Sequence, residues 1–413
     1  MNIVFNALNF SPEIVGNAKY TSELVYWLSN YANKIIVITT NPYYPEWECH
    51  FNRYNKEIKK NIIIYRCPIY VPKRVNGFTK ILHYLSFLIT SLPVGIISTK
   101  YKPDLIFTIC PTIFSIPTTV LISFLTRIFS KKKVLKWIHY QDLEIEAAFD
   151  LNILKGVYLK KLVLCIEKFV LNKFNIVSTI SYGMMEKLKN KVLRSENLYF
   201  LPNFIDTKKY AVDYKNKKEN PFFDQLKLNS NNYVVMYSGT LNEKLSYEVL
   251  INSIYSLKKY KDIVWIISGD GPLKKFLINK LDNLENVKFM PFQDKEILPT
   301  WLNIADIHLI PQKISVSNLV LPSKLLGILC SSKPVIGIAK KNSDLDKILS
   351  YVGISINSED PELLSNSILK LIKNNKLRKE LSEKGFKYVE KFYEKETVLS
   401  KLISEIRDLD VLN

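Results

Sequence analysis

The chain has 413 residues, of which 47% are hydrophobic and 23% are charged, and its formal net charge is +19. This composition excludes an intrinsically disordered chain, and the length is enough for two domains that each bury a core. The five cysteines are scattered without a CxxC pair, which argues against a disulfide framework or a zinc site and fits a reducing cytoplasm.

The positive charge is concentrated in the first half of the chain. Residues 1–203 hold 26 Lys and Arg against 13 Asp and Glu, a balance of +13, whereas residues 204–413 hold 32 against 26, a balance of +6. A general lysine bias would raise both halves alike. The asymmetry predicts an anionic partner for the first half, which is membrane lipid, a lipid-linked diphosphate or nucleic acid.

Strand-like and helix-like segments alternate through residues 1–203. We predict strands near 2–8, 34–40, 61–67, 104–109, 133–139 and 175–180, and helices near 17–32, 78–98, 112–129, 155–173 and 182–192. The first ten residues, MNIVFNALNF, form a strand pattern and lack the basic start of a signal peptide. Prolines and hydroxyl residues interrupt the apolar segments 84–98 and 105–126, which favours buried elements over membrane-spanning helices.

Residues 207–230 are polar and lysine-rich and are predicted to form a linker or an insertion. A second alternation follows, with strands near 233–238, 263–268, 286–290, 306–310 and 333–338, and helices near 245–259, 272–281, 294–303, 322–331, 361–374, 376–388 and 392–409. The pattern predicts two α/β domains with doubly wound parallel sheets, residues 1–203 and 204–390. The last helix, about 392–410, is expected to pack back on the first domain. Ligands of such sheets bind beyond the carboxyl ends of the strands.

The most informative segment is residues 313–335, KISVSNLVLPSKLLGILCSSKPV. It is predicted to form a loop and then a helix that opens with Leu321, Pro322, Ser323 and Lys324. A helix N-terminus presents unpaired N–H groups and the positive end of the helix dipole, so a lysine there does not stabilise the helix. A bound anion such as a diphosphate would account for Lys324 at this position.

A second candidate anion site is the segment from Tyr237 to Lys244, predicted as a strand end followed by a loop. Gly239 would let the backbone approach a ligand, and Lys244 is long enough to reach a phosphate. An ordinary turn with a surface lysine is the alternative. The segment 268–272, SGDGP, is predicted first as a tight turn after a buried strand and second as a ligand loop.

The first half has a similar loop at residues 10–20, FSPEIVGNAKY, which leads into an amphipathic helix. Gly16 would allow close approach of the backbone to a phosphate. Asn17 is expected to cap the helix through its side chain, and the same helix start can serve both purposes.

Polar residues follow the predicted strand 133–139. His139, Asp142, Glu144 and Glu146 cluster there, where the carboxyl end of a strand places side chains at a site. An isolated histidine is more often structural, but the clustering favours a function. We therefore predict catalytic roles for His139, Asp142 and Glu144.

Three cations lie at the start of the apolar segment 78–98. Lys73, Arg74 and Lys80 stand beside aromatic and apolar residues, a combination that suits a membrane interface or a lipid-linked acceptor. The alternative is a helix packed in the core with a solvated basic start.

These motifs in combination resemble family 4 glycosyltransferases, which have the GT-B fold of two facing Rossmann-like domains with a cleft between them. The resemblance covers nearly the whole chain and extends to one bacterial branch, the fucosyl- and N-acetylfucosaminyltransferases of colanic-acid and O-antigen assembly. It rests on residues 43–47, 68–73, 137–149 and the proline-serine-lysine helix start at 322–324. The chain departs from most of the family at Leu319 and Gly327, where two glutamates are usual, and at Thr240, where an arginine is usual.

The resemblance implies a metal-independent, cofactor-free transfer of a sugar from a UDP- or GDP-sugar with retention of anomeric configuration. It assigns the donor diphosphate to Gly16, Asn17, Gly239, Lys244, Leu321, Ser323 and Lys324, and the base and ribose to Pro291, Phe292 and Leu319. The sugar would be a 6-deoxyhexose such as fucose or N-acetylfucosamine.

The acceptor implied by the resemblance is a lipid-diphosphate-linked saccharide in the synthesis of a surface polysaccharide such as O-antigen or capsule. The enzyme would lie on the inner face of a bacterial cytoplasmic membrane, in peripheral contact with anionic lipid, and would bind no nucleic acid. Two alternatives remain open at this stage. One is a sugar-nucleotide epimerase of the same fold, and the other is a non-catalytic basic protein that binds lipid or nucleic acid.

Overall fold

The computed structural model describes residues 1–13, 16–44, 47–74, 76–110, 113–143, 145, 156–210, 212, 217–316 and 321–411. The chain divides into two compact units, one formed by Met1–Asn203 with Leu399–Asn413 and the other by Phe204–Val398. The division after Asn203 coincides with the expected domain boundary. Most of the last helix, α16 (Lys395–Val411), belongs to the first unit although it follows the second in sequence.

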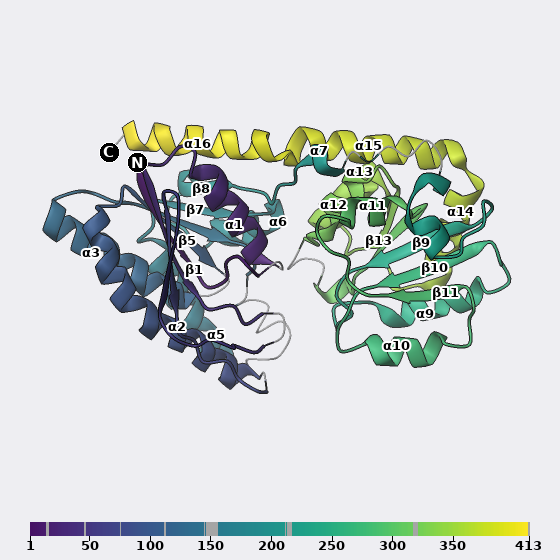
Figure 1. The fold of residues 1–413 in the computed structure, drawn as a ribbon, viewed down its shortest axis with the longest axis horizontal. Coiled ribbons are helices and arrows are strands. Elements are labelled where there is room, and N and C mark those ends of the chain that lie inside the picture. Colours follow the sequence, from purple (N-terminus) through teal and green to yellow (C-terminus); the bar gives the residue numbers. More distant parts are fainter. Residues whose placement is uncertain are drawn as a thin grey trace. The chain divides into compact units, whose positions relative to one another are not determined.

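The first unit is built on an eight-stranded sheet in the order β3-β4-β2-β1-β5-β6-β7-β8 (Figure 1). Neighbouring strands are parallel except β3, which runs antiparallel to β4. The strands are β1 (Asn2–Ala7), β2 (Lys34–Thr40), β3 (Asn55–Lys59), β4 (Ile62–Cys67), β5 (Leu105–Cys110), β6 (Leu135–Tyr140), β7 (Ile176–Thr179) and β8 (Leu198–Phe200).

The helices of the first unit cover both faces of this sheet. They are α1 (Asn17–Leu28), α2 (Gly77–Ser98), α3 (Ile116–Ser130), α5 (Val157–Leu171), α6 (Tyr182–Lys189) and the short turns η1 (Thr99–Tyr101), η2 (Ile113–Ser115) and η3 (Ser195–Asn197). The connections through α2, α3, α5 and α6 all cross the sheet in one direction, and the connection through α1 crosses in the other. Since parallel crossovers are right-handed, α2, α3, α5 and α6 share one face and α1 lies on the opposite face. Figure 1 shows α2, α3 and α5 together along one flank of the sheet.

The second unit has six parallel strands in the order β11-β10-β9-β12-β13-β14. The strands are β9 (Tyr233–Ser238), β10 (Ile263–Ser268), β11 (Val287–Met290), β12 (Ile307–Pro311), β13 (Val335–Ile338) and β14 (Ile354–Ile356). The helical elements are α7 (Thr207–Tyr210), η4 (Lys217–Glu219), α8 (Phe222–Gln225), α9 (Tyr247–Ser256), α10 (Lys274–Leu281), α11 (Leu298–Asn303), η5 (Ile314–Val316), α12 (Lys324–Cys330), α13 (Asp344–Val352), α14 (Pro361–Lys373) and α15 (Asn375–Tyr393).

The prediction of a linker over residues 207–230 is wrong for its second half. Phe222, Phe223, Leu226 and Leu228 are buried in the core of the second unit. The Phe222 ring packs edge-on against Trp301, with ring centroids 4.8 Å apart. These four apolar side chains lie among lysines in the sequence, and the lysine content concealed them.

The strand order identifies where a ligand would bind in each unit. In the first sheet, successive connections move outward in opposite directions from β1 and β5, and in the second sheet from β9 and β12. Such a reversal opens a crevice at the carboxyl edge of a parallel sheet. The loops after β1, β5, β9 and β12 are therefore the places where the two units can hold a ligand.

Candidate functional site

At the switch point of the second sheet, Lys324 reaches the end of strand β9. Its ammonium nitrogen lies 3.7 Å from the centre of the Tyr237 ring, which is the last aromatic ring of that strand. A Cβ atom on Gly239 would lie 3.1 Å from the same nitrogen. Gly239 also has φ +154°, a conformation that favours glycine. The absence of a side chain at position 239 therefore makes room for the Lys324 amine.

The Lys324 side chain is partly exposed, and its amine has no carboxylate partner among the described residues. Burial lowers its pKa to about 7. The Tyr237 hydroxyl donates to the Thr240 carbonyl oxygen at 2.7 Å, so only the face of the ring is offered to the cation. A cation held away from water without a counter-ion destabilises a fold, and a bound anion would offset that cost.

Lys244 lies on the same loop as Gly239 and is exposed. Its backbone is fixed on both sides, because its N–H donates to Asn242 Oδ1 at 3.1 Å and its carbonyl oxygen accepts from the Lys313 N–H at 2.9 Å. The loop is thus tied to the segment that follows β12, while the long side chain of Lys244 remains in solvent. Lys244 is therefore a second cation on the loop that carries Gly239, beside which the Lys324 amine lies.

The SGDGP segment, residues 268–272, is hydrogen-bonded to the loop that carries Gly239. Gly239 N–H donates to the Ser268 carbonyl oxygen and Leu241 N–H to that of Asp270, each at 2.9 Å. A Cβ atom on Gly269 or on Gly271 would clash with the carbonyl oxygens of Gly239 and Leu241 respectively. Both glycines serve close packing of two backbones, which is the tight-turn interpretation of the segment.

The residues expected to hold the base lie at the end of β11. The Pro291 carbonyl oxygen accepts from Ser268 Oγ at 2.9 Å and from Gln293 Nε2 at 3.1 Å. The Phe292 ring is 52% exposed and lies beside Gly269. A flat, accessible aromatic surface next to the loop that carries Gly239 is suited to stacking against a nucleotide base.

Helix α12 begins at Lys324, two residues later than predicted. Ser323 precedes it, is exposed and makes no capping hydrogen bond through its side chain, and Leu321 is half-buried against the core. Leu319 lies outside the described residues. At position 327, a Cβ atom would lie 3.4 Å from Tyr210 Cε1. A side chain there would therefore meet the Tyr210 ring.

In the first unit, the loop after β1 leads into helix α1. Gly16 is the N-cap residue with φ +55°, and no side chain caps the helix. The expectation that Asn17 is the N-cap is wrong: Asn17 is the first helical residue, because only Gly16 readily takes the positive φ of the preceding turn. Among the described residues that are not its chain neighbours, no atom lies within 4 Å of a Cβ atom built on Gly16, so none of them blocks the approach of a ligand there.

Two buried ionisable side chains outside the predicted site hold this loop in place. The Glu13 carboxylate accepts from the backbone N–H groups of Tyr43 and Tyr44 at 3.0 Å each. Burial raises the pKa of Glu13. Arg66 donates to the Ser11 carbonyl oxygen at 2.6 Å. The only signal in the sequence is an arginine inside an otherwise apolar strand.

His139 is buried at the end of β6. Its Nδ1 lies 2.9 Å from Ser178 Oγ and its Nε2 lies 2.9 Å from Gln141 Nε2. Burial lowers the pKa of His139 to about 3, so the imidazole is neutral. Ser178 Oγ also accepts from Trp137 Nε1 at 2.7 Å. With both nitrogens bonded inside the protein, His139 positions the end of β6, and this geometry does not support the expected catalytic role.

Asp142 lies two residues beyond the end of β6 and is partly exposed. Because β1, β5 and β6 are parallel neighbours, Asp142 and the Gly16 loop lie at the same edge of the first sheet. Glu144 and Glu146 lie outside the described residues.

Lys73 and Arg74 are exposed just before α2, and Lys80 lies in its first turn with its ammonium 5.6 Å from the centre of the Tyr84 ring. Asn76 caps this helix through its side chain, which accepts from the Thr79 N–H at 2.9 Å. The start of α2 is thus capped by a side chain and flanked by cations.

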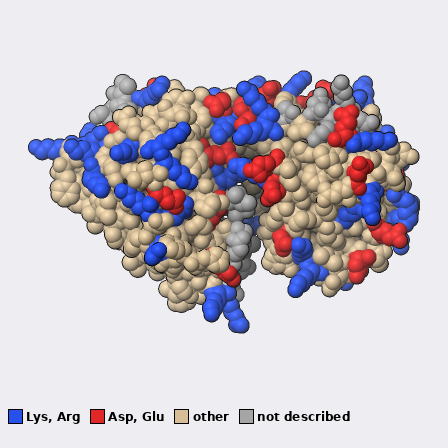
Figure 2. Space-filling model, in the orientation of Figure 1, with Lys and Arg blue, Asp and Glu red and all other residues tan. Residues whose placement is uncertain are grey.

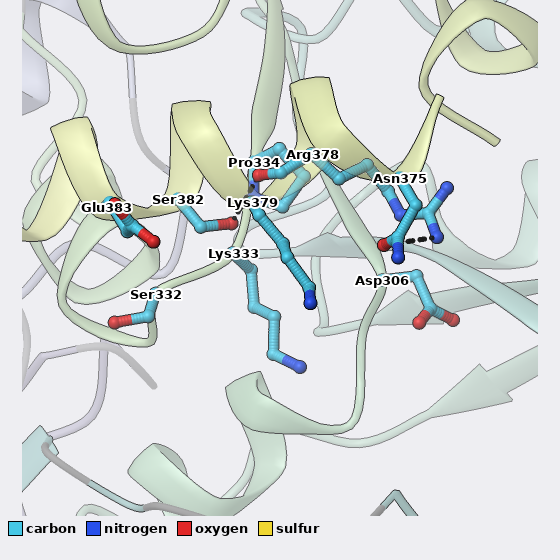
Figure 3. Close-up of a pocket in the computed structure, with 9 residues that line it drawn as sticks. All are labelled: Asp306, Ser332, Lys333, Pro334, Asn375, Arg378, Lys379, Ser382 and Glu383. Carbon is cyan, nitrogen blue, oxygen red and sulfur yellow. Dashed lines mark hydrogen bonds between the residues drawn. The ribbon is translucent and has the colours of Figure 1, made fainter. Parts of the chain in front are cut away.

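A separate pocket of about 290 Å³ opens at the opposite edge of the second sheet. Asp306 and Lys333 line it just before β12 and β13, and Figure 3 shows the amines of Lys333 and Lys379 directed toward it. Burial lowers the pKa of Lys333. This polar pocket lies at the amino ends of the strands, away from Gly239 and Lys324, and the sequence analysis did not predict it. Among the described residues, no three His, Cys, Asp or Glu side chains are grouped to hold a metal ion.

Comparison with known proteins places this geometry in context. The family model described as "Glycosyl transferases group 1" matches residues 218–388, which include Gly239, Lys244 and Lys324. The Escherichia coli K12 protein named "Putative colanic acid biosynthesis glycosyl transferase WcaI" is 32% identical over 422 residues, covering 98% of this chain and 100% of the relative.

Solved structures with the same architecture cover essentially the whole chain. Sucrose-phosphate synthase from Thermosynechococcus elongatus superposes with a TM-score of 0.73 at 14% identity and covers 100% of both chains. Anabaena HepE in complex with UDP and glucose superposes with a TM-score of 0.69 at 15% identity, over 99% of this chain and 100% of that one. These likenesses confirm the predicted two-domain GT-B fold.

Proposed function

Because this chain belongs to the group 1 glycosyl transferases, we propose that it transfers a sugar from a nucleoside-diphosphate donor to a lipid-linked saccharide. The observation that carries the donor half of the proposal is the buried Lys324 amine, which has no carboxylate partner among the described residues and lies against the space left open at Gly239. Membership in a family of glycosyltransferases leaves no place for the non-catalytic alternative.

The donor diphosphate is the leaving group, and its developing charge must be stabilised. Lys324 supplies a fixed cation at the end of β9, and Lys244 supplies a mobile one from the same loop. The UDP in the HepE structure, which shares this fold, supports a nucleoside-diphosphate sugar as donor, and we propose a UDP- or GDP-sugar. Phe292 would stack on the base, and we propose Gly16 and Asn17 as further contacts of the diphosphate.

The acceptor hydroxyl must be held against the anomeric carbon, and its proton must have a destination. His139 is neutral and fully bonded, so it does not take that proton. We propose a front-side attack that retains anomeric configuration, in which a donor phosphate oxygen takes the proton and no protein nucleophile takes part. Asp142, and Glu144 from the sequence, would then orient the acceptor. We propose that the reaction needs no metal ion and no cofactor.

The relative's name, which mentions colanic acid biosynthesis, supports a role in surface-polysaccharide synthesis. We propose a 6-deoxyhexose such as fucose or N-acetylfucosamine as the transferred sugar. The charge balance of +13 in residues 1–203 favours a lipid-diphosphate acceptor in that unit. Such an enzyme would work on the inner face of a bacterial cytoplasmic membrane.

The test is incubation of the purified protein with UDP- and GDP-sugars, 6-deoxyhexoses included, and a lipid-diphosphate-linked saccharide. Mass spectrometry would detect the extended saccharide, and NMR would give its anomeric configuration. The Lys324→Met variant should lose product formation, whereas the Lys341→Met variant, which changes a surface lysine of the same unit, should retain it. If no donor yields product or free nucleoside diphosphate, the proposal fails. A changed sugar without acceptor would instead indicate an epimerase.

A further inference from the structure

We propose that the outer face of helices α2, α3 and α5 is a docking surface for an anionic lipid bilayer. The inference rests on the proposed function, because a lipid-linked acceptor would be met at a membrane. The observations that support it are independent of the donor site. It extends the expected contact at Lys73, Arg74 and Lys80 to one face of three helices.

The first observation is the exposure of large apolar side chains on all three helices. Six examples are Phe78 and Ile89 on α2, Phe124 and Phe129 on α3, and Leu162 and Phe169 on α5. The exposed fractions of the four α3 and α5 members run from 59% for Leu162 to 72% for Phe129. Scattered apolar residues are normal on a protein surface, but a layer of them on three adjacent helices is not.

The second observation is that these helices are already packed on their inner side. Ser91 of α2 and Thr118 of α3 share a hydrogen bond of 2.8 Å, and a Cβ atom on Gly95 would lie 2.9 Å from Thr118 Cγ2. By length and composition α2 with η1, and α3 with η2, are apolar enough to cross a membrane. Since their inner faces belong to the unit's own core, their outer apolar faces suit a surface contact better than a crossing.

The third observation is the sign of the charge on these helices. They contain five cations, which are Lys80, Arg127, Lys160, Lys161 and Lys168. Their one carboxylate, Glu167, is buried and bonded to Lys191 Nζ at 2.6 Å. Figure 2 shows Lys and Arg side chains spread over the visible face of the first unit with few carboxylates among them.

A further cluster of cations, formed by Arg127, Lys136 and Lys173, lies near the C-terminal ends of α3 and α5. The pKa of Lys136 is lowered by burial and by the nearness of Lys173 and Arg127. Apolar side chains flanked by cations match the layers of an anionic bilayer surface, in which aromatic and aliphatic groups enter the interface and cations remain among the headgroups. A second copy of this chain would bring like charges together, so the charge favours lipid over self-association.

The experiment is flotation of the full-length protein with vesicles of phosphatidylcholine alone or mixed with phosphatidylglycerol. We expect binding to the anionic vesicles and much weaker binding to the neutral ones. The double variant Phe124→Ser, Phe169→Ser should bind anionic vesicles about tenfold or more weakly, because two exposed rings no longer enter the interface. The control Phe276→Ser, Phe392→Ser changes two exposed helical phenylalanines of the second unit and should bind as the unchanged protein does.

A charge variant tests the electrostatic part. Arg127→Gln with Lys168→Gln should weaken binding to anionic vesicles by roughly fivefold per cation and leave the weak binding to neutral vesicles unchanged. Undiminished binding by the double serine variant, or equal binding to both vesicles by the unchanged protein, would overturn the inference. So would a dimer in sedimentation that becomes a monomer in the serine variant. A thermal shift with UDP reports the donor site separately, so loss of that shift with intact flotation would count only against the proposed function.

Discussion

The ammonium of Lys324 lies 3.7 Å from the centre of the Tyr237 ring, and burial lowers its pKa to about 7. Near neutral pH this amine is therefore only partly protonated in the free protein. An anion bound beside it would favour the protonated form and raise the pKa again. Proton uptake and anion binding are thus coupled at this site.

The first prediction concerns the pH dependence of nucleotide binding. As pH rises from about 7 to 9, the free amine loses its proton and UDP or GDP must restore it on binding. The dissociation constant should rise by up to about tenfold per pH unit in this range. Calorimetry in two buffers of different ionisation enthalpy would measure the proton uptake. The Lys324→Met variant should bind weakly at every pH, and a strong pH dependence in that variant would assign the effect to another group.

The second prediction concerns stability without ligand. The pKa of Lys324 falls from its usual 10.5 in the unfolded chain to about 7 in the folded protein. Between these values the unfolded chain binds more protons, so the free energy of unfolding rises with pH. At pH 6 the Lys324→Met variant should be more stable than the unchanged protein by on the order of 1 kcal/mol. Urea unfolding at pH 6 and 8.5 measures both values, and a destabilised variant at pH 6 would contradict the burial argument.

The third prediction concerns Lys244, whose side chain is exposed on the donor loop. A charge-assisted contact to a phosphate contributes roughly 1.5–3 kcal/mol, so Lys244→Ala should weaken nucleoside-diphosphate binding about tenfold or more. Stability should change little, because the side chain is exposed. Lys341→Ala is the matched control. Equal affinity of the two variants would remove Lys244 from the site.

The fourth prediction separates structural from tolerant glycines. In Gly269→Ala the new methyl group would clash with the Gly239 carbonyl oxygen, and φ at this position is +146°. We expect a loss of at least about 2 kcal/mol in the free energy of unfolding. In Gly385→Ala, within α15, the atom nearest to the methyl group would be Leu329 Cδ2, the end of a flexible side chain, at 3.0 Å. That change should lie within about 1 kcal/mol of the unchanged protein, since alanine favours a helix.

The fifth prediction concerns His139. Its pKa falls from 6.5 to about 3 on folding, so the folded protein binds fewer protons between these values. The stability that depends on a neutral His139 is present above pH 6.5 and is lost as pH falls, by about 1.4 kcal/mol per pH unit. Urea unfolding of His139→Gln should show a shallower acid slope. The exposed His50→Gln control should keep the steeper slope, and a catalytic histidine would instead show activity titrating near its pKa.

The sequence predicts the main strands well because their side chains form continuous apolar runs. The ranges 233–238 and 263–268 agree with β9 and β10 residue for residue. Helices cover both faces of these parallel strands, so no alternation is needed. Strand β14 has only three residues, too few for a pattern. Helix α13 (Asp344–Val352) is not among the predicted helices. The sequence does contain a signal for it, because Ser343 caps the helix by accepting from the Asp346 N–H.

The sequence predicts the site at positions where a residue type in a local pattern has one common function. Glycine followed by a nearby lysine, and a lysine at a helix start, both indicate an anion, and the structure brings Lys324 to the open side of Gly239. The Tyr237 ring beneath the amine depends on a contact between distant segments, which no local pattern contains. The same holds for the bonds of His139 to Ser178 and of Glu13 to the backbone of Tyr43.

The hydrogen bonds that join the loop after β9 to the turn after β10 have a thermodynamic consequence. Gly239 and Leu241 donate to one turn, and Leu273 N–H donates back to the Leu241 carbonyl oxygen at 3.0 Å. A backbone held in this way has little conformational entropy left to lose when a nucleotide arrives. This rigid loop should therefore discriminate between donors by their shape. Phosphate analogues that are too bulky for it should not bind.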